Sequence, residues 1–139
     1  MSTMGINEAI PKILSEYKNI AVVGVSKKPD RDSYSVAKFM LLKGYNMTPV
    51  NPMYPEVLGK ICYPSLVDLP EKIELVDIFR KSDQVLPIVE QAIQIGVKAV
   101  WMQLGVINEE AAKLASDAGL KVVMNRCWKI EYQNYMNNF

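Results

Sequence analysis

A three-part pattern, an amphipathic helical stretch followed by a glycine and then an apolar strand, occurs three times in this sequence. Glycine readily adopts the left-handed conformation that ends many helices, so each of these glycines marks a helix end directly before a strand. Helices and strands that alternate in this way build βαβ units, whose strands lie parallel. The three copies are residues 32–50 with Gly44, residues 82–102 with Gly96, and residues 108–124 with Gly119.

Two further apolar runs complete the predicted sheet. Residues 20–25 are largely β-branched, which is typical of a strand covered on both faces, and residues 75–79 form a second such strand. A helix over residues 7–17, with Asn7 as its N-cap, precedes them. With right-handed crossovers we expect an α/β fold: a Rossmann-like three-layer sandwich with a mostly parallel sheet of five to six strands and helices on both faces.

Residues 51–74 break this alternation. Four prolines in the stretch leave room for only a short strand near residues 61–63 and one turn of helix. No long linker or second apolar core is present, and half of the 139 residues are hydrophobic, which is enough for one core. We therefore expect a single domain over residues 1–139.

Charge and composition exclude several classes of function. Sixteen basic and fifteen acidic residues give a net charge of +1, so no global field attracts nucleic acid or an anionic membrane. Residues 1–12 lack the apolar stretch of a signal peptide, and two cysteines without metal-site spacing indicate reduced thiols, so we expect a cytoplasmic protein. The absence of histidine excludes Ser–His and Cys–His pairs, a phosphohistidine and the usual imidazole metal site. We predict no catalytic residue and no metal site.

The loop after residues 20–25 has the features of a phosphate site. Ligands of open parallel sheets bind beyond the carboxyl ends of the strands, and this loop leads into a helix start, where free backbone N–H groups favour anions. Gly24 allows close approach, Ser26 and Ser33 supply hydroxyls, and Lys28 and Arg31 supply cations. Ser33 or the aspartate before it also suits the helix N-cap. Solvated surface charge is the alternative interpretation of the lysine.

This loop does not match the dinucleotide fingerprint GxGxxG, since only the first glycine is present. An ordinary NAD site is therefore disfavoured. Several cations in one short loop favour a ligand with more phosphate than NAD. Coenzyme A (CoA), which carries a diphosphate and a 3′-phosphate, meets that description.

The loops after two other strands add candidate ligand contacts. Asn51, Pro52 and Tyr54 follow one strand, where the amide can donate to a ribose or phosphate and the ring can flank an adenine; an ordinary Asn-Pro turn is the alternative. Phe79 and Arg80 follow another strand, where the ring can cover the adenine or pantetheine. A core aromatic beside a surface cation is the alternative for this second pair.

Gln103 and Cys127 follow the last two predicted strands. A polar Gln103 directly after a buried strand suits a pocket mouth, where it can bind pantetheine amides. Cys127 has no histidine to activate it, so a structural thiol is favoured over a nucleophile. The aromatic tail after it is expected to pack on the domain or on a second subunit.

Taken together and in this order, the loops resemble those of the small stand-alone CoA-binding proteins, which are similar to the N-terminal CoA-binding domain of the succinyl-CoA synthetase alpha subunit. The resemblance implies a Rossmann-like fold and a CoA site. It places the phosphate loop on Val25, Ser26, Lys28, Arg31 and Ser33, the second loop on Asn51, Pro52 and Tyr54, and further contacts on Phe79, Arg80 and Gln103. The motifs that carry it are Gly24-Val25-Ser26, Val50-Asn51-Pro52, Cys62-Tyr63-Pro64-Ser65, Asp77-Ile78-Phe79-Arg80, Trp101-Met102-Gln103-Leu104-Gly105 and Asn125-Arg126-Cys127.

The expected function is non-catalytic binding of CoA or an acyl-CoA, as a carrier, sensor or partner subunit. The synthetases add a second domain with a phosphorylated histidine, and this sequence contains no histidine. The alternative is an NAD(P)-dependent oxidoreductase, which normally needs a substrate domain and a proton donor. The expected partner is a small nucleotide ligand; a homodimer or a protein partner stays open.

Overall fold

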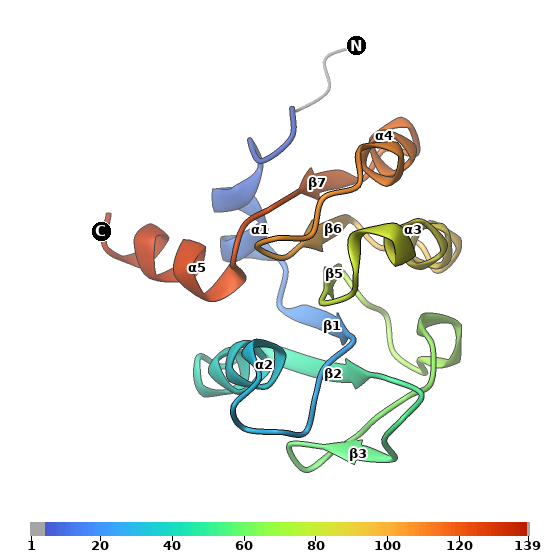
Figure 1. Cartoon of the computed structure of the whole chain (residues 1–139). Helices are drawn as coiled ribbons and strands as arrows, with labels where there is room; N and C mark the ends of the chain where they lie inside the picture. Colours follow the sequence, from blue (N-terminus) through green and yellow to red (C-terminus); the bar gives the residue numbers. More distant parts are fainter. Residues whose placement is uncertain (1–4, 139) are drawn as a thin grey trace.

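The computed structural model describes residues 5–138, in which a five-stranded parallel sheet lies between two layers of helices (Figure 1). Every strand pair of this sheet is parallel, as predicted. In spatial order the strands are β2 (Asn46–Val50), β1 (Asn19–Val23), β5 (Leu75–Ile78), β6 (Ala99–Met102) and β7 (Lys121–Val123). The predicted α/β Rossmann-like sandwich is confirmed.

The helices cover both faces of the sheet (Figure 1). One layer holds α1 (Ile10–Glu16), α2 (Asp32–Leu42) and α5 (Trp128–Met136), and the other holds α3 (Val85–Gln94) and α4 (Glu109–Asp117). Successive side chains of β1 enter opposite cores: Ile20 and Val22 pack with the first layer, Ala21 and Val23 with the second. Burial on both faces explains why the strands are continuous apolar runs in the sequence.

The order of strands creates a switch point between β1 and β5. The chain passes from β1 to β2 on one side, and then returns to place β5 on the other side of β1. The loops that leave β1 and β5 therefore diverge to opposite sides of the sheet, and the crevice between them is where open parallel sheets bind ligands.

The first helix begins later than predicted, because Asn7 does not act as its N-cap. The cap position is Ala9, and α1 starts at Ile10. Asn7 has a φ of 70°, a conformation that asparagine tolerates better than most residues. Its side chain accepts from the Met124 N–H at 2.7 Å and donates to the Met124 carbonyl at 3.2 Å. This asparagine therefore ties the N-terminal segment to the end of β7.

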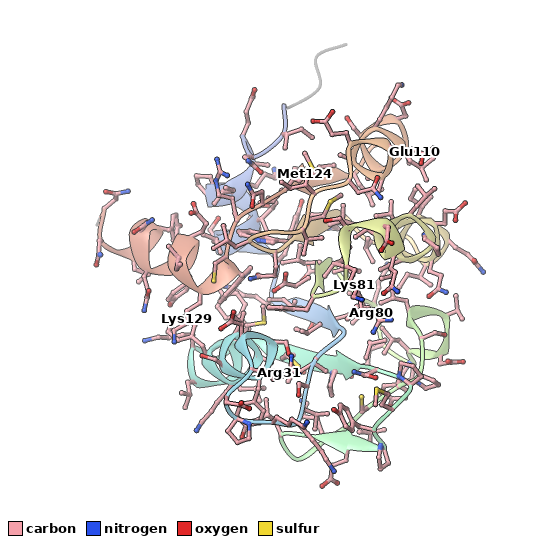
Figure 2. All side chains as sticks on the ribbon, in the orientation of Figure 1. Arg31, Arg80, Lys81, Glu110, Met124 and Lys129 are labelled. Carbon is pink, nitrogen blue, oxygen red and sulfur yellow. The ribbon has the colours of Figure 1, made fainter. Side chains whose placement is uncertain are left out.

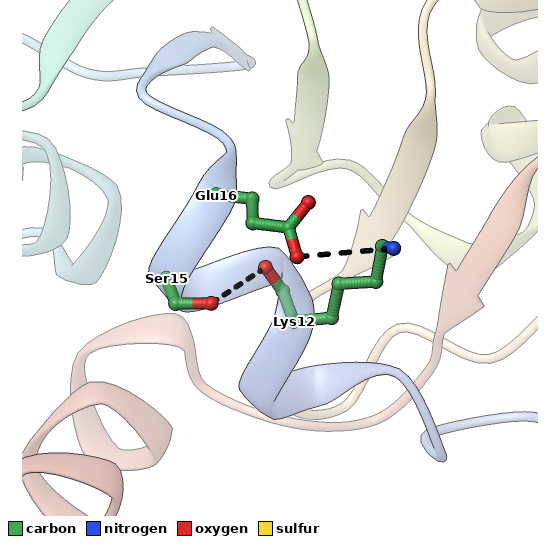
Figure 3. A network of polar contacts seen from close by, with 3 residues as sticks. All are labelled: Lys12, Ser15 and Glu16. Atoms are coloured by element: carbon green, nitrogen blue, oxygen red, sulfur yellow. Dashed lines mark hydrogen bonds and ion pairs between the residues drawn. The ribbon is translucent and has the colours of Figure 1, made fainter.

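Helix α1 is held mainly by the burial of Ile13 and Leu14. On its exposed side, Lys12 and Glu16 form an ion pair at 3.8 Å, and the Ser15 hydroxyl donates to the Lys12 carbonyl at 3.2 Å (Figure 3). An exposed pair of this spacing contributes only about 0.3–0.5 kcal/mol.

The cap predicted for α2 is also wrong. Arg31 occupies the N-cap position, and no side chain caps the helix. The Ser33 hydroxyl, which suited that role, instead accepts a hydrogen bond from the Ser26 backbone N–H at 2.9 Å. Gly44 ends the helix with a φ of 87°, as predicted.

The irregular segment contains a hairpin where a single short strand near residues 61–63 was predicted. Strands β3 (Glu56–Val57) and β4 (Lys60–Ile61) pair antiparallel around Leu58 and Gly59, which both have positive φ. Gly59 suits its position, but a leucine is unusual at the first turn position, so the sequence lacked the usual pair of turn residues. The predicted helical turn is present as a 3₁₀ turn over Leu66–Asp68.

The C-terminal helix α5 packs on the domain through aromatic rings. Trp128 is fully buried and stacks on Tyr132 with ring centroids 5.4 Å apart, while Tyr45 meets Trp128 edge-on at 4.9 Å. The Tyr45 hydroxyl donates to the Leu14 carbonyl at 2.6 Å, and burial raises the pKa of Tyr45 to about 12. These contacts fix the start of α5 beside α2, at the ligand end of the sheet.

Candidate binding cleft

A cleft of about 700 Å³ lies beyond the carboxyl ends of β1, β5 and β6, between the starts of α2 and α5. It occupies the switch point of the sheet, where the topology places a ligand. The structure brings together here Gly24, Ser26, Arg31, Ser33, Phe79, Arg80 and Gln103, all of which the sequence singled out.

Gly24 is required by the close approach of the β1 and β5 loops. Its φ is 84°, and its N–H donates to the Val50 carbonyl at 2.9 Å. A Cβ at this position would overlap the Phe79 carbonyl oxygen and lie 2.8 Å from the Arg80 Cδ. A side chain here would therefore both strain the backbone and push apart the two loops that form the cleft.

Two hydroxyls at the start of α2 each accept one hydrogen bond from the backbone of the loop. The Ser33 hydroxyl accepts from the Ser26 N–H at 2.9 Å, and the Ser26 hydroxyl accepts from the Lys28 N–H at 3.0 Å. Each hydroxyl keeps its own proton for donation. The arrangement therefore presents O–H donors beside the free N–H groups of the first turn of α2, which suits an anion.

Three cations border the cleft from three different elements. Arg31 stands at the start of α2, Arg80 follows β5, and Lys129 lies in the first turn of α5 (Figure 2). Within residues 5–138 the ion pairs are Lys12–Glu16 and Lys113–Asp117, so none of the three cations is held in an ion pair there. Asp30 and Asp32 also line the cleft, so the positive charge is local and offset in part.

Gln103 is buried at the base of the cleft. Its Oε1 accepts from the Trp128 N–H at 3.0 Å, which fixes the amide plane against the start of α5. The amide nitrogen is then the group of this side chain that can donate to a ligand. A fixed amide donor suits a ligand that carries carbonyl groups.

Five of the predicted contacts do not line the cleft: Val25, Lys28, Asn51, Pro52 and Tyr54. Val25 is fully buried, and Lys28 is exposed on the loop. The Asn51 amide donates to the Val25 carbonyl at 2.9 Å and accepts from the Met53 N–H, so it links the first and second loops. Tyr54 is half-buried, with the Lys27 ammonium 5.5 Å from its ring. These residues shape or flank the loops around the cleft.

Pro52 borders a smaller hollow of about 180 Å³, on the other side of the β1–β5 loops. Gly24 and Arg80 line both hollows, so the two are neighbours across the close approach of the loops.

The sequence did not indicate several residues that line the cleft, because they lie in segments that read as surface or tail. Leu104 and Val106 belong to the loop after β6, and Lys129 and Ile130 to the first turn of α5. The signal for Leu104 and Val106 was their position in the loop after a strand, since parallel strands bring such loops to one edge. Lys129 and Ile130 lie in the helix that follows the last strand and its loop.

The two thiols occupy different environments. Cys127 is half-buried, lies at the N-cap of α5 and lines the cleft. Cys62 is buried, its Sγ contacts the Asn51 carbonyl at 3.5 Å, and burial raises the pKa of its thiol. Reagents in solvent therefore have access to Cys127 before Cys62.

One acid is fully buried in the sheet. Asp77 lies on β5 between Val22 and Trp101 of the neighbouring strands. Among the described residues its carboxyl oxygens have no partner at hydrogen-bonding geometry. Burial raises the pKa of Asp77 well above its usual range, and the nearby Ile78 backbone N–H lowers it by less.

No helix over residues 5–138 is long and apolar enough to cross a membrane. Within the same residues, no group of three or more Cys, Asp or Glu side chains is placed to hold a metal ion.

A match to a model of a protein family shows which family this chain belongs to. A model described as a CoA binding domain matches residues 18–133, which include every element that borders the cleft. The chain belongs to this CoA-binding domain family. The resemblance drawn from the loops is confirmed at that level.

Relatives of this family occur both alone and within larger chains. The Bacillus subtilis protein YneT is 38% identical over 123 residues, which cover 88% of this chain and 91% of that protein. A solved structure from Pyrococcus horikoshii OT3 is 47% identical, with a TM-score of 0.91, and the match covers 98% of this chain and 99% of that one. An ADP-forming acetate–CoA ligase of Methanocaldococcus jannaschii is 34% identical over 89 residues, which cover 63% of this chain and 12% of the ligase.

Proposed function

We propose that this chain binds CoA or an acyl-CoA in the cleft and has no catalytic activity of its own. The observation that carries the proposal is that a cleft at the switch point, with hydroxyls and unpaired cations at a helix start, lies inside the region matched by the CoA-binding family model. The ADP-forming ligase supports it, because its name states that it acts on CoA.

The chemistry of the lining suits the parts of CoA. The phosphates are expected at the start of α2, where Ser26 and Ser33 donate hydrogen bonds and Arg31 supplies charge. Pantetheine carries two amides, which need partners when they leave water. Gln103 is the fixed amide that can provide one.

Binding without catalysis is supported by what the cleft offers. The chain contains no histidine, so neither Cys127 nor a serine has an imidazole base. The groups that line the cleft are those that position a ligand: hydroxyls, an amide and cations. A carrier, sensor or partner-subunit role follows from this proposal.

Thermal unfolding with four ligands tests the proposal. A ligand that binds only the folded state raises the melting temperature by mass action, so CoA is expected to stabilise the protein more than dephospho-CoA or NAD. Stabilisation by NADP with no effect of CoA would show an oxidoreductase-type site and contradict the proposal.

A matched pair of arginine variants locates the site. Arg31→Ala removes a charge-assisted contact to phosphate, which is worth about 1.5–3 kcal/mol, so CoA affinity is expected to fall roughly 10- to 100-fold. Arg126→Ala is the control, because Arg126 is also exposed at this end of the sheet but does not line the cleft. Equal CoA affinity in the two variants, measured by calorimetry, would place the phosphates elsewhere.

A further inference from the structure

The two ends of the cleft differ in polarity. The end at α2 carries the hydroxyls and Arg31, whereas the end formed by the β6–α4 loop and α5 carries exposed apolar side chains, with Lys129 and Gln133 beside them. Leu104 is 63% exposed and Ile130 is 48% exposed, and both line the cleft from separate elements. Val106, almost buried, lies in the same lining. A water-filled cleft with an apolar end suits a ligand that is itself part polar and part apolar.

Hydrogen bonds hold this apolar end in place. The Gly105 N–H donates to the Asn125 Oδ1 at 2.8 Å, and the Val106 N–H donates to the Gln103 carbonyl at 2.8 Å. The next residue, Ile107, donates its N–H to the Ser82 Oγ at 2.9 Å. Leu104 is therefore displayed toward solvent by a fixed loop, and it does not fold back into the core.

Ile130 is fixed in a comparable way. It lies in the first turn of α5, two residues after Trp128. Trp128 is fully buried, and its N–H donates to the Gln103 Oε1. Gln103 also directly precedes Leu104, so it lies close to both of the segments that carry these apolar residues. A pantetheine arm that met Gln103 would bring its sulfur to the part of the cleft that Leu104 and Ile130 line.

We propose that the ligand is a medium-chain acyl-CoA, whose acyl chain lies against Leu104, Val106 and Ile130. This inference rests on the proposed function, because the polar end of the cleft must first hold the CoA phosphates. Free CoA would leave the apolar end facing water. An acyl chain continues from the CoA sulfur and covers that end.

The affinity gain follows from the area that the chain buries. A fully buried methylene tightens binding roughly fourfold, and one buried to about half tightens it roughly twofold. The five carbons beyond the carbonyl of a hexanoyl group then give roughly thirtyfold tighter binding than CoA.

Calorimetric titration with CoA, acetyl-CoA, butyryl-CoA and hexanoyl-CoA tests this inference on the full chain. Affinity is expected to rise along the series. If hexanoyl-CoA binds no more tightly than CoA, the acyl site is wrong while the proposed CoA binding stands. If none of the four binds, the proposed function fails together with the acyl site.

Matched variants test where the acyl chain lies. Leu104→Ser and Ile130→Ser are expected to remove most of the preference for hexanoyl-CoA over CoA, with both affinities measured on the same variant. Saturable binding of CoA by each variant shows that it is folded. The controls are Ile107→Ser and Met136→Ser, since these side chains are 48% and 47% exposed on the same two elements but do not line the cleft. A preference for hexanoyl-CoA that survives in Leu104→Ser and Ile130→Ser, or that is lost equally in the controls, would overturn the placement.

Discussion

Gly24 offers a quantitative test of how the two central loops meet. In Gly24→Ala, the left-handed backbone costs about 1–2 kcal/mol for a residue with a Cβ. The new Cβ would also overlap the Phe79 carbonyl oxygen, and relieving such an overlap typically costs about 1–3 kcal/mol. The free energy of unfolding is therefore expected to fall by about 2–5 kcal/mol.

Gly119→Ala is the control for this measurement. Gly119 has a φ of 89°, close to that of Gly24, but a Cβ there would meet nothing within 4 Å. Urea unfolding of the two variants separates the backbone cost from the overlap. A loss in Gly24→Ala no larger than that in Gly119→Ala would refute the close approach of the β1 and β5 loops.

Three other features give measurable expectations. Acetyl-CoA, which has no free thiol, is expected to slow the alkylation of Cys127 by iodoacetamide, because Cys127 lines the cleft. Cys62 is buried and should not react. An unchanged rate of Cys127 labelling would place the ligand away from this thiol. Because burial raises the pKa of Asp77 above its ordinary value of 3.8, the folded state binds this proton more tightly than the unfolded state, so stability should fall as pH rises from about 4, by up to about 1.4 kcal/mol per pH unit. Asp77→Asn removes that slope in urea unfolding across pH 4–7, and an equal slope in both proteins would contradict the raised pKa. Asn7→Ala loses two hydrogen bonds to Met124, which contribute about 1 kcal/mol each, and it places an alanine at a positive φ. Asn7→Gly loses the same hydrogen bonds without that backbone strain, so it should unfold at a higher temperature than Asn7→Ala. Equal thermal stability of the two variants would show that the backbone at this position is not strained.

The main sheet and its helices could be predicted from the sequence, because each signal there is local. Glycines at helix ends and apolar runs in strands act over a few residues, and the crossover rule then fixes a parallel sheet. The hairpin around Leu58 and Gly59 could not be predicted, since a leucine stands at the turn position where asparagine, aspartate or glycine usually precedes the glycine.

The parts of the cleft that come from the strand ends could also be predicted, whereas its tertiary partnerships could not. Ser26 and Gln103 lie in loops just after strands, and Arg31 lies where the first of these loops enters α2, so topology alone brings them together. Whether Asn51 binds a ligand or links two loops depends on what lies opposite its amide, which is the Val25 carbonyl. The roles of Lys129 and Ile130 depend on how α5 packs beside α2, and that is set by ring contacts such as Tyr45 with Trp128.

The most direct test of CoA binding in the cleft is the change in backbone amide chemical shifts when ¹⁵N-labelled protein is titrated with CoA. We predict saturable shifts within the segments 24–36, 79–80, 103–106 and 127–130, which contain most of the residues that line the cleft. Amides of the β3–β4 hairpin and of α4, which do not line it, should stay unchanged. Shifts confined to those control segments, or none at millimolar CoA, would contradict the account.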